Sequence, residues 1–159
     1  MGNLALKQKA FPPRLPVFPK SQGLGTPQVE IPLFSHRISC GLFGVHDDSI
    51  EKYQSLDKKF IKNRAATFFF RAGGDSMSPY IEENDILVVD KSLEPCNSQI
   101  IIFSLDGEMF CKRYFKTPSS LILRSDNPQY KDRILTKDSI ADFLVFGVVI
   151  GLARETSLT

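Results

Sequence analysis

The sequence has few of the residues that build metal sites and disulfide frameworks. Its 159 residues include three cysteines and two histidines. The cysteines, Cys40, Cys96 and Cys111, are odd in number and form no Cys-x-x-Cys pair, and His36 and His46 complete no zinc-type cluster. We therefore expect no metal or other cofactor and a reducing, cytoplasmic environment.

Long hydrophobic runs are also missing. Residues 1–20 carry lysines but no continuous apolar stretch, because Pro12, Pro13, Pro16 and Pro19 interrupt it. This pattern argues against a signal peptide. No segment approaches the roughly 20 apolar residues of a membrane-spanning helix, so we expect no membrane association.

The glycine-rich loops that bind nucleotide phosphates do not occur either, so nucleotide binding has no support. The net charge is +2 and is unevenly spread: residues 1–40 carry +4 and residues 41–159 carry −2. The body of the chain is therefore not a basic nucleic-acid module, and we expect no strong direct binding to DNA. We interpret the basic N-terminal segment as a solubility feature.

The length suits one domain plus a tail, and the 42% hydrophobic and 24% charged content is ordinary for a globular protein. Residues 1–30 are rich in Pro, Gly, Lys and Gln, which predicts a mobile arm without its own core. Apolar residues return over 31–44, with glycines at 41 and 44. That segment is either an extended strand along a surface or a linker with a hydrophobic staple.

One short helix is predicted to begin at Asp47-Asp48-Ser49. Acidic residues suit the positive end of a helix, and Ile50, Tyr53 and Leu56 follow at three-residue spacing. Residues 58–63 continue or end this helix.

From residue 66 onward, apolar and aromatic runs alternate with turn signals, which predicts β-strands. The turn signals include Asp106-Gly107, a strong hairpin signal, because the tightest hairpin turns require positive backbone angles. We expect a mainly β, compact, antiparallel barrel-like or sandwich-like body with an extended N-terminal arm. The expected strands are Ala66–Arg71, Ile86–Asp90, Gln99–Leu105, Met109–Phe115, Leu121–Arg124 and Leu144–Leu152.

A glycine turn, Gly73–Pro79, presents a serine between two of these strands. Glycine permits backbone angles that other residues resist, so Ser76 can be exposed without steric cover. Many such turns are only turns. Ser78 and Ser104 lack the glycines, and Cys40 and Cys111 lack an identifiable histidine partner, which makes them weaker candidates for a nucleophile.

The strand after Asp106-Gly107 carries a candidate base. Side chains alternate along a strand, so Phe110, Lys112 and Tyr114 share one face. A lysine between aromatic rings is partly desolvated, which lowers its pKa and lets the neutral amine accept a proton from a serine. Alternatively, Lys112 keeps its charge in water at the edge of the sheet, and periodicity alone favours that alternative.

An ordered series of motifs resembles the LexA/UmuD family of self-cleaving serine peptidases, most nearly its UmuD branch, the accessory subunits of error-prone polymerase V. The resemblance covers roughly residues 31–152, and the order of the motifs is more specific than any one of them. They are Leu33-Phe34-Ser35, Cys40-Gly41, Gly74–Met77, Asn84–Asp90, Asp106–Glu108, Lys112-Arg113, Ser125–Tyr130 and Val145–Ile150.

This resemblance implies roles for particular residues. Ser76 is the nucleophile, Lys112 is the general base, and the bond between Cys40 and Gly41 is the one that is cut. The backbone N–H groups of Asp75 and Ser76 are the expected oxyanion donors. An arm of residues 1–40 is then removed, which leaves a Ser-Lys peptidase domain of residues 41–159.

The family also implies partners and a setting. Its members act as homodimers and cut themselves faster in the presence of a RecA filament on single-stranded DNA. The shortened form joins a UmuC-like polymerase for synthesis across DNA lesions in the SOS response. Two departures are present: the arm before Cys40 is longer than expected, and Asn84 stands where glycine is more common, although asparagine tolerates the left-handed conformation.

Other functions remain open at this level. A LexA-like or phage-type self-cleaving transcriptional regulator requires a helix-turn-helix before the cleavage site, for which residues 1–30 are short and proline-rich. A relative of the signal peptidases requires a membrane anchor. A non-catalytic interaction module of the same fold does not require an intact Ser76 and Lys112.

Overall fold

The computed structural model of the chain describes residues 30–34, 50–136 and 142–156. These residues fall into two compact units, one before residue 63 and one from residue 63 onward. The bond between Cys40 and Gly41, nearly all of the predicted arm and the predicted helix start at Asp47 lie outside the described residues.

The smaller unit contains a two-stranded antiparallel hairpin and one helical turn. Strand β1 (Ile31–Phe34) pairs with β2 (Ile50–Gln54), and helix α1 (Leu56–Phe60) follows with Ser55 as its N-cap. The apolar side chains that the structure describes in this unit are exposed or half-buried.

The predicted helix is therefore wrong over Ile50–Gln54, which form a strand, and the helix begins only at Leu56. A three-residue apolar spacing is compatible with a helix but does not require one. What decides the conformation is the pairing partner, since β1 lies opposite β2, with Leu33 facing Lys52 and Pro32 facing Tyr53. The sequence of β2 alone does not contain that partner.

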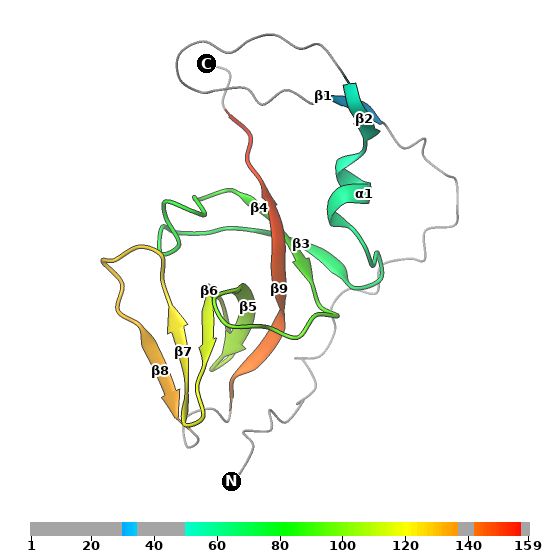
Figure 1. Cartoon of the computed structure of the whole chain (residues 1–159). Coiled ribbons are helices and arrows are strands. Elements are labelled where there is room, and N and C mark those ends of the chain that lie inside the picture. Colours follow the sequence, from blue (N-terminus) through cyan, green and yellow to red (C-terminus); the bar gives the residue numbers. More distant parts are fainter. Residues whose placement is uncertain (1–29, 35–49, 137–141, 157–159) are drawn as a thin grey trace. The chain divides into compact units, whose positions relative to one another are not determined.

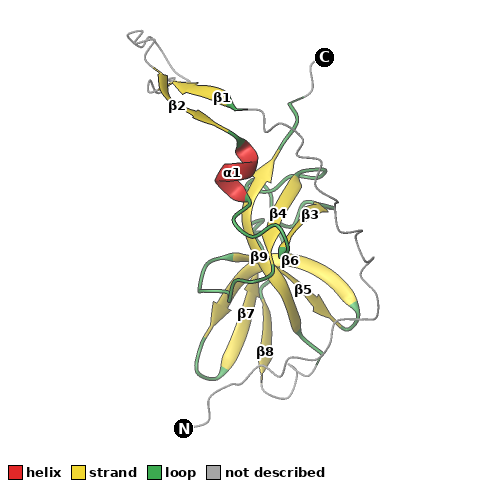
Figure 2. Ribbon diagram, turned by 90° about the vertical axis from the view of Figure 1, so that its right-hand side faces the viewer, coloured by secondary structure: helices red, strands yellow, loops and turns green. Residues whose placement is uncertain are grey.

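The larger unit is built on a seven-stranded antiparallel sheet in the order β3-β4-β9-β5-β6-β7-β8 (Figure 1). Figure 2 shows its strands in yellow and the connecting turns in green. All six predicted strands are present with ends within one residue of the prediction, and β8 was not predicted. The strands are β3 (Thr67–Arg71), β4 (Ile86–Asp90), β5 (Ile100–Leu105), β6 (Glu108–Lys116), β7 (Ser120–Arg124), β8 (Arg133–Thr136) and β9 (Leu144–Ala153).

The mainly β, antiparallel fold class is confirmed, but in the described residues the sheet does not close into a barrel, since β3 and β8 remain its two edges. No helix in the described part of the chain reaches the length and hydrophobicity that a membrane span requires.

Strand β5 lies at the centre of this sheet, and all six of its residues are buried. Its alternating side chains enter two different hydrophobic clusters. Ile101 and Phe103 belong to a cluster with Leu121, Leu123 and Phe143. Ile100 and Ile102 belong to a second cluster with Met77, Ile81, Leu87, Val89 and Phe146. The second cluster includes Met77, the residue after Ser76. Core packing therefore fixes the turn Gly73–Pro79, called the serine turn below, against the sheet.

Strand β9 contributes to both clusters, and its register against β5 shifts at Phe146. Ile102 lies opposite Gly147 and Phe103 opposite Val145, which leaves Phe146 as the extra residue of a β-bulge. Gly147 is required next to it, because a Cβ at this position would lie 2.7 Å from the carbonyl oxygen of Asp90.

The turns adopt the backbone conformations that their sequences predict. Asp106 and Gly107 have φ values of 53° and 84° and connect β5 to β6, as the Asp-Gly signal predicts. Asn84 has a φ of 72°, which is the left-handed conformation that asparagine tolerates.

Candidate active site

Two strands and one turn bring Ser76 and Lys112 together, although 36 residues separate them in sequence. Lys112 lies in the middle of β6, and its Nζ donates a hydrogen bond to Ser76 Oγ at 2.5 Å. Both side chains are half-buried. A nucleophile within hydrogen-bond distance of its base is the basic requirement of a two-residue peptidase site.

The surroundings of Lys112 favour its neutral form. Burial removes water from the ammonium group and lowers the pKa of Lys112, while the nearby Cys111, Asp126 and Asp75 act in the opposite direction. Phe110 and Tyr114 contact one hydrophobic cluster and Cys111 contacts the other, as the predicted alternation along β6 requires. Lys112 is therefore placed between two packed clusters rather than fully in water.

The serine turn presents two free backbone donors. Gly74 has a φ of 74°, a conformation that glycine adopts without strain. Among the described residues, no acceptor takes the N–H of Asp75 or of Ser76, whereas the N–H of Ser78 donates to the Asp75 carbonyl at 3.0 Å. Free amides beside a nucleophile can stabilise the oxyanion of a tetrahedral intermediate.

The segment that follows β7 holds this turn from the other side. The Asn127 backbone N–H donates to the Ser76 carbonyl at 3.1 Å, and Asn127 Nδ2 donates to the Asp75 carbonyl at 3.1 Å. These bonds join residues about fifty positions apart in the chain. They fix the backbone on both sides of the bond between Asp75 and Ser76.

Tyr130, in the same segment, contacts both the turn and the lysine. Its hydroxyl donates to Asp75 Oδ1 at 2.5 Å, and its ring centroid lies 5.5 Å from Lys112 Nζ. An aromatic ring at this distance attracts a lysine ammonium through its quadrupole. Tyr130 therefore contacts both Lys112 and Asp75, the residue before Ser76.

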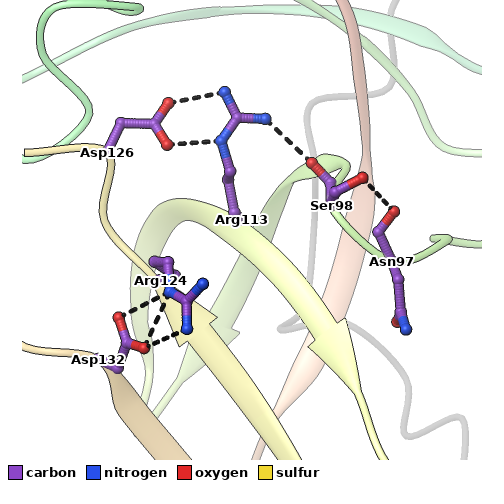
Figure 3. Close-up of polar contacts among 6 residues, drawn as sticks. All are labelled: Asn97, Ser98, Arg113, Arg124, Asp126 and Asp132. Carbon is purple, nitrogen blue, oxygen red and sulfur yellow. Dashed lines mark hydrogen bonds and ion pairs between the residues drawn. The ribbon is translucent and has the colours of Figure 1, made fainter.

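An ion pair fixes the residue next to Lys112 (Figure 3). The guanidinium of Arg113 donates from Nε and Nη2 to the two oxygens of Asp126, at 2.5 and 2.8 Å, and from Nη1 to the Ser98 carbonyl at 3.0 Å. Two parallel hydrogen bonds of this kind give a planar, well-oriented pair. Strand β6 is thereby tied to the segment that holds the serine turn.

The segment between the serine turn and β4 is anchored to the residue that follows β9. The Asp85 carboxylate is 1% exposed and accepts two hydrogen bonds from Arg154, at 2.7 and 2.6 Å, and one from the Glu82 backbone N–H at 2.9 Å. The hydrogen bond from Arg154 lowers the pKa of Asp85, so the pair is charged at neutral pH.

A cavity of about 120 Å³ opens beside the two functional side chains. A larger cavity of about 500 Å³ also lies in this unit but includes neither Ser76 nor Lys112. Cavity size alone favours the larger one as a site. The chemistry favours the smaller one, which is lined by Ala72, Gly73, Gly74, Ser76, Met77, Ile81, Met109, Phe110, Cys111 and Lys112.

The alternative nucleophile in this region is not activated. Cys111 lies next to Lys112, but burial raises the pKa of its thiol to about 12, so the thiolate is not populated at neutral pH. In the described ranges, no group of three or more His, Cys, Asp or Glu side chains is arranged to hold a metal ion.

Comparison with known proteins assigns the chain to a family. Residues 32–150 match the family described as Peptidase S24-like. The chain belongs to that family. Protein ImpA of Salmonella typhimurium is 35% identical over 127 residues, which are 79% of this chain and 84% of that protein. Protein SamA of Salmonella typhimurium is 35% identical over 133 residues, 83% of this chain and 91% of that protein.

A third similar protein is a repressor. LexA repressor 1 of Geobacter sulfurreducens is 32% identical over 108 residues, 67% of this chain and 52% of that protein. Together these matches confirm the LexA/UmuD resemblance, and the chain is a member of this family of self-cleaving peptidases.

The structure thus places Ser76, Lys112 and the Asp75 amide in one site, while the Cys40–Gly41 bond lies outside the described residues. Sequence reasoning gave no role to Asn127 or Tyr130. Both lie in the Ser125–Tyr130 motif of the family resemblance, which was the one signal that could have pointed to them.

Proposed function

We propose that this S24-like protein is a serine endopeptidase that acts on itself through a dyad of Ser76 and Lys112. The observation that carries the proposal is the 2.5 Å distance between Lys112 Nζ and Ser76 Oγ. The lowered pKa of Lys112 supports it, because a base must be neutral to accept a proton.

In the proposed reaction, neutral Lys112 takes the hydroxyl proton of Ser76 as Oγ attacks the carbonyl carbon of Cys40. The N–H groups of Asp75 and Ser76 donate to the oxyanion. Protonated Lys112 then gives its proton to the nitrogen of Gly41, and the Cys40–Gly41 bond breaks. Water, deprotonated by Lys112, hydrolyses the remaining ester between Ser76 and the Cys40 carbonyl.

The products of this reaction are an arm of residues 1–40 and a shortened protein of residues 41–159. By analogy with the UmuD branch, we propose that the intact protein is a cytoplasmic homodimer and that RecA on single-stranded DNA stimulates its cleavage. The shortened form then acts with a UmuC-like polymerase in synthesis across DNA lesions. The similarity to ImpA and SamA over most of their length supports this branch.

The test combines purified protein with RecA, single-stranded DNA and a nucleotide, and weighs the products by mass spectrometry. We expect a fragment that begins at Gly41 and none from Ser76→Ala. A fragment from Ser76→Ala, or none from the native chain, contradicts the proposal. The second outcome favours a non-catalytic interaction module of the same fold.

The LexA match supports a second candidate, a self-cleaving transcriptional regulator. A binding titration of the intact chain with duplex DNA distinguishes the two. Sequence-specific retention of duplex that disappears after cleavage favours the regulator, and its absence favours the polymerase subunit.

A further inference from the structure

The charged groups around Lys112 decide how easily its amine loses a proton. Cys111 and Arg113 flank it on β6, Asp126 faces it from the segment after β7, and Asp75 faces it from the serine turn. A carboxylate that paired directly with Lys112 would stabilise the ammonium and draw Nζ away from Ser76. The two aspartates are therefore potential competitors of the serine.

Both aspartates are held by other partners. Asp126 accepts two hydrogen bonds from Arg113, at 2.5 and 2.8 Å, so its charge is already paired. Asp75 has no cation among its hydrogen-bond partners in the described residues. Its oxygens instead accept from the Tyr130 hydroxyl at 2.5 Å and from Asn127 Nδ2 at 3.5 Å. The Tyr130 bond is the short one, so Tyr130 is the main restraint on this carboxylate.

The position of the Tyr130 ring adds a second contact. Its centroid lies 5.5 Å from Lys112 Nζ, while its hydroxyl reaches Asp75. One side chain thus contacts both members of the pair that would otherwise form. The hydrogen bond to Asp75 also raises the pKa of Tyr130, so its hydroxyl remains a donor through the neutral range.

From this geometry we propose that Tyr130 is a positioning residue which holds the Asp75 carboxylate away from Lys112 and so leaves Nζ directed at Ser76. The inference rests on the dyad proposed above, and Tyr130 itself touches no reacting atom. Without the Tyr130 hydroxyl, the Asp75 side chain turns toward Nζ, and the lysine holds its proton more tightly. Removal of the Asp75 charge cancels this effect.

The first experiment measures the Lys112 pKa directly by NMR titration of a chain labelled with ¹³C at the lysine Cε. All titrations use a Ser76→Ala background, so that the chain stays intact. We expect Tyr130→Phe to raise the Lys112 pKa by about one unit, because it frees the carboxylate but keeps the ring. In an Asp75→Asn background, we expect the same tyrosine substitution to produce no shift.

The second experiment measures the rate of self-cleavage against pH with Ser76 intact. Tyr130→Phe is expected to move the midpoint of the profile upward by about one unit, so the rate well below the midpoint falls about tenfold. Adding Asp75→Asn is expected to restore the native midpoint. A purely structural role for Tyr130 would lower the rate at every pH and leave the midpoint in place, which would overturn the proposal.

Tyr80→Phe is the matched control, because Tyr80 also places its ring over a β6 cation, at 5.2 Å from Arg113, and its hydroxyl bonds neither aspartate. If Tyr80→Phe shifted the Lys112 pKa as much as Tyr130→Phe does, the proposal would be overturned. The NMR titration does not depend on cleavage. A native chain that fails to cut while Lys112 still responds to Tyr130→Phe therefore contradicts the peptidase function and not the positioning role.

Discussion

The β1–β2 hairpin and the seven-stranded sheet are both antiparallel, but they bury their side chains to very different extents. In the hairpin, Ile31, Leu33 and Tyr53 are exposed, whereas every residue of β5 is buried between two clusters. A two-stranded hairpin is marginally stable by itself, and a sheet with packed faces is not. The stability of this protein therefore resides in the sheet, which also carries Lys112 and supports the turn that presents Ser76.

The test of this contrast with the largest expected effect compares two lysine-to-arginine substitutions. Lys112→Arg is expected to slow self-cleavage by about 10²–10⁴-fold at any accessible pH, because arginine stays protonated and cannot act as a base. Lys52→Arg, in the exposed β2 strand, changes no group of the site. Fragment yield over time measures both. Equal losses in the two variants would mean that the hairpin takes part in the chemistry.

A pair of leucines tests where stability resides. Leu87 is 1% exposed in the cluster beneath the serine turn, and Leu56 is 70% exposed at the start of α1. Leu87→Ala is expected to lower the free energy of unfolding by about 2–5 kcal/mol. Leu56→Ala is expected to change it by less than about 0.5 kcal/mol. Urea unfolding measures both, and a large loss from Leu56→Ala would show that the hairpin unit also depends on packing.

The anchor between Asp85 and Arg154 is expected to have the next largest effect. Arg154→Ala leaves a buried carboxylate without its cation and is expected to lower the free energy of unfolding, but by less than Leu87→Ala, since the Arg154 side chain is 41% exposed. The folded-state pKa of Asp85 lies below its ordinary value of 3.8, so the pair stabilises the fold above that pH. This stability is lost as the pH falls through the folded-state pKa.

Chemical unfolding at pH 7 and at pH 3 checks that sign. The difference between the native chain and Arg154→Ala is expected to be large at pH 7 and smaller at pH 3. A difference that grows in acid would contradict the assignment of the effect to the Asp85 carboxylate.

The last test, which needs no substitution, is the pH dependence of the native chain. Desolvation lowers the pKa of Lys112 from 10.5, so the fraction of neutral amine rises with pH. Self-cleavage is expected to accelerate about tenfold per pH unit below that pKa and to level off above it. A rate that falls as the pH rises, or that shows no acceleration at any pH below 10.5, would rule out Lys112 as the base.

The sheet was predictable from the sequence because its strands are separated by turn residues with definite conformational demands. Asp106-Gly107 fixed the β5–β6 hairpin, and the alternation along β6 correctly separated Phe110 and Tyr114 from Cys111. Strand β8 was missed because its four residues include one buried side chain, Leu135, and form the sheet edge, where little packing constrains the pattern.

The site was predictable only in part. The residues of the dyad were singled out by a glycine turn and a lysine among aromatics, together with the order of the family motifs. The contacts of Asn127 and Tyr130 with Asp75 span 52 and 55 residues, and nothing local in the sequence specifies them. The pairing of β2 with β1 escaped prediction for the same reason, since a strand partner distant in sequence overrides local apolar spacing.

The bulge makes Phe146 the one residue of β9 that the β5–β9 ladder does not need. Ile102 lies opposite Gly147 and Phe103 opposite Val145, so without Phe146 these neighbours would pair with successive residues of β5, and Val148 would stay opposite Ile101. The loss would instead fall on the cluster beneath the serine turn, which contains the Phe146 ring in edge contact with Phe68 and Phe70. A relative that lacks this residue can therefore keep the register of its last strand, but it must fill the space of the ring with another side chain.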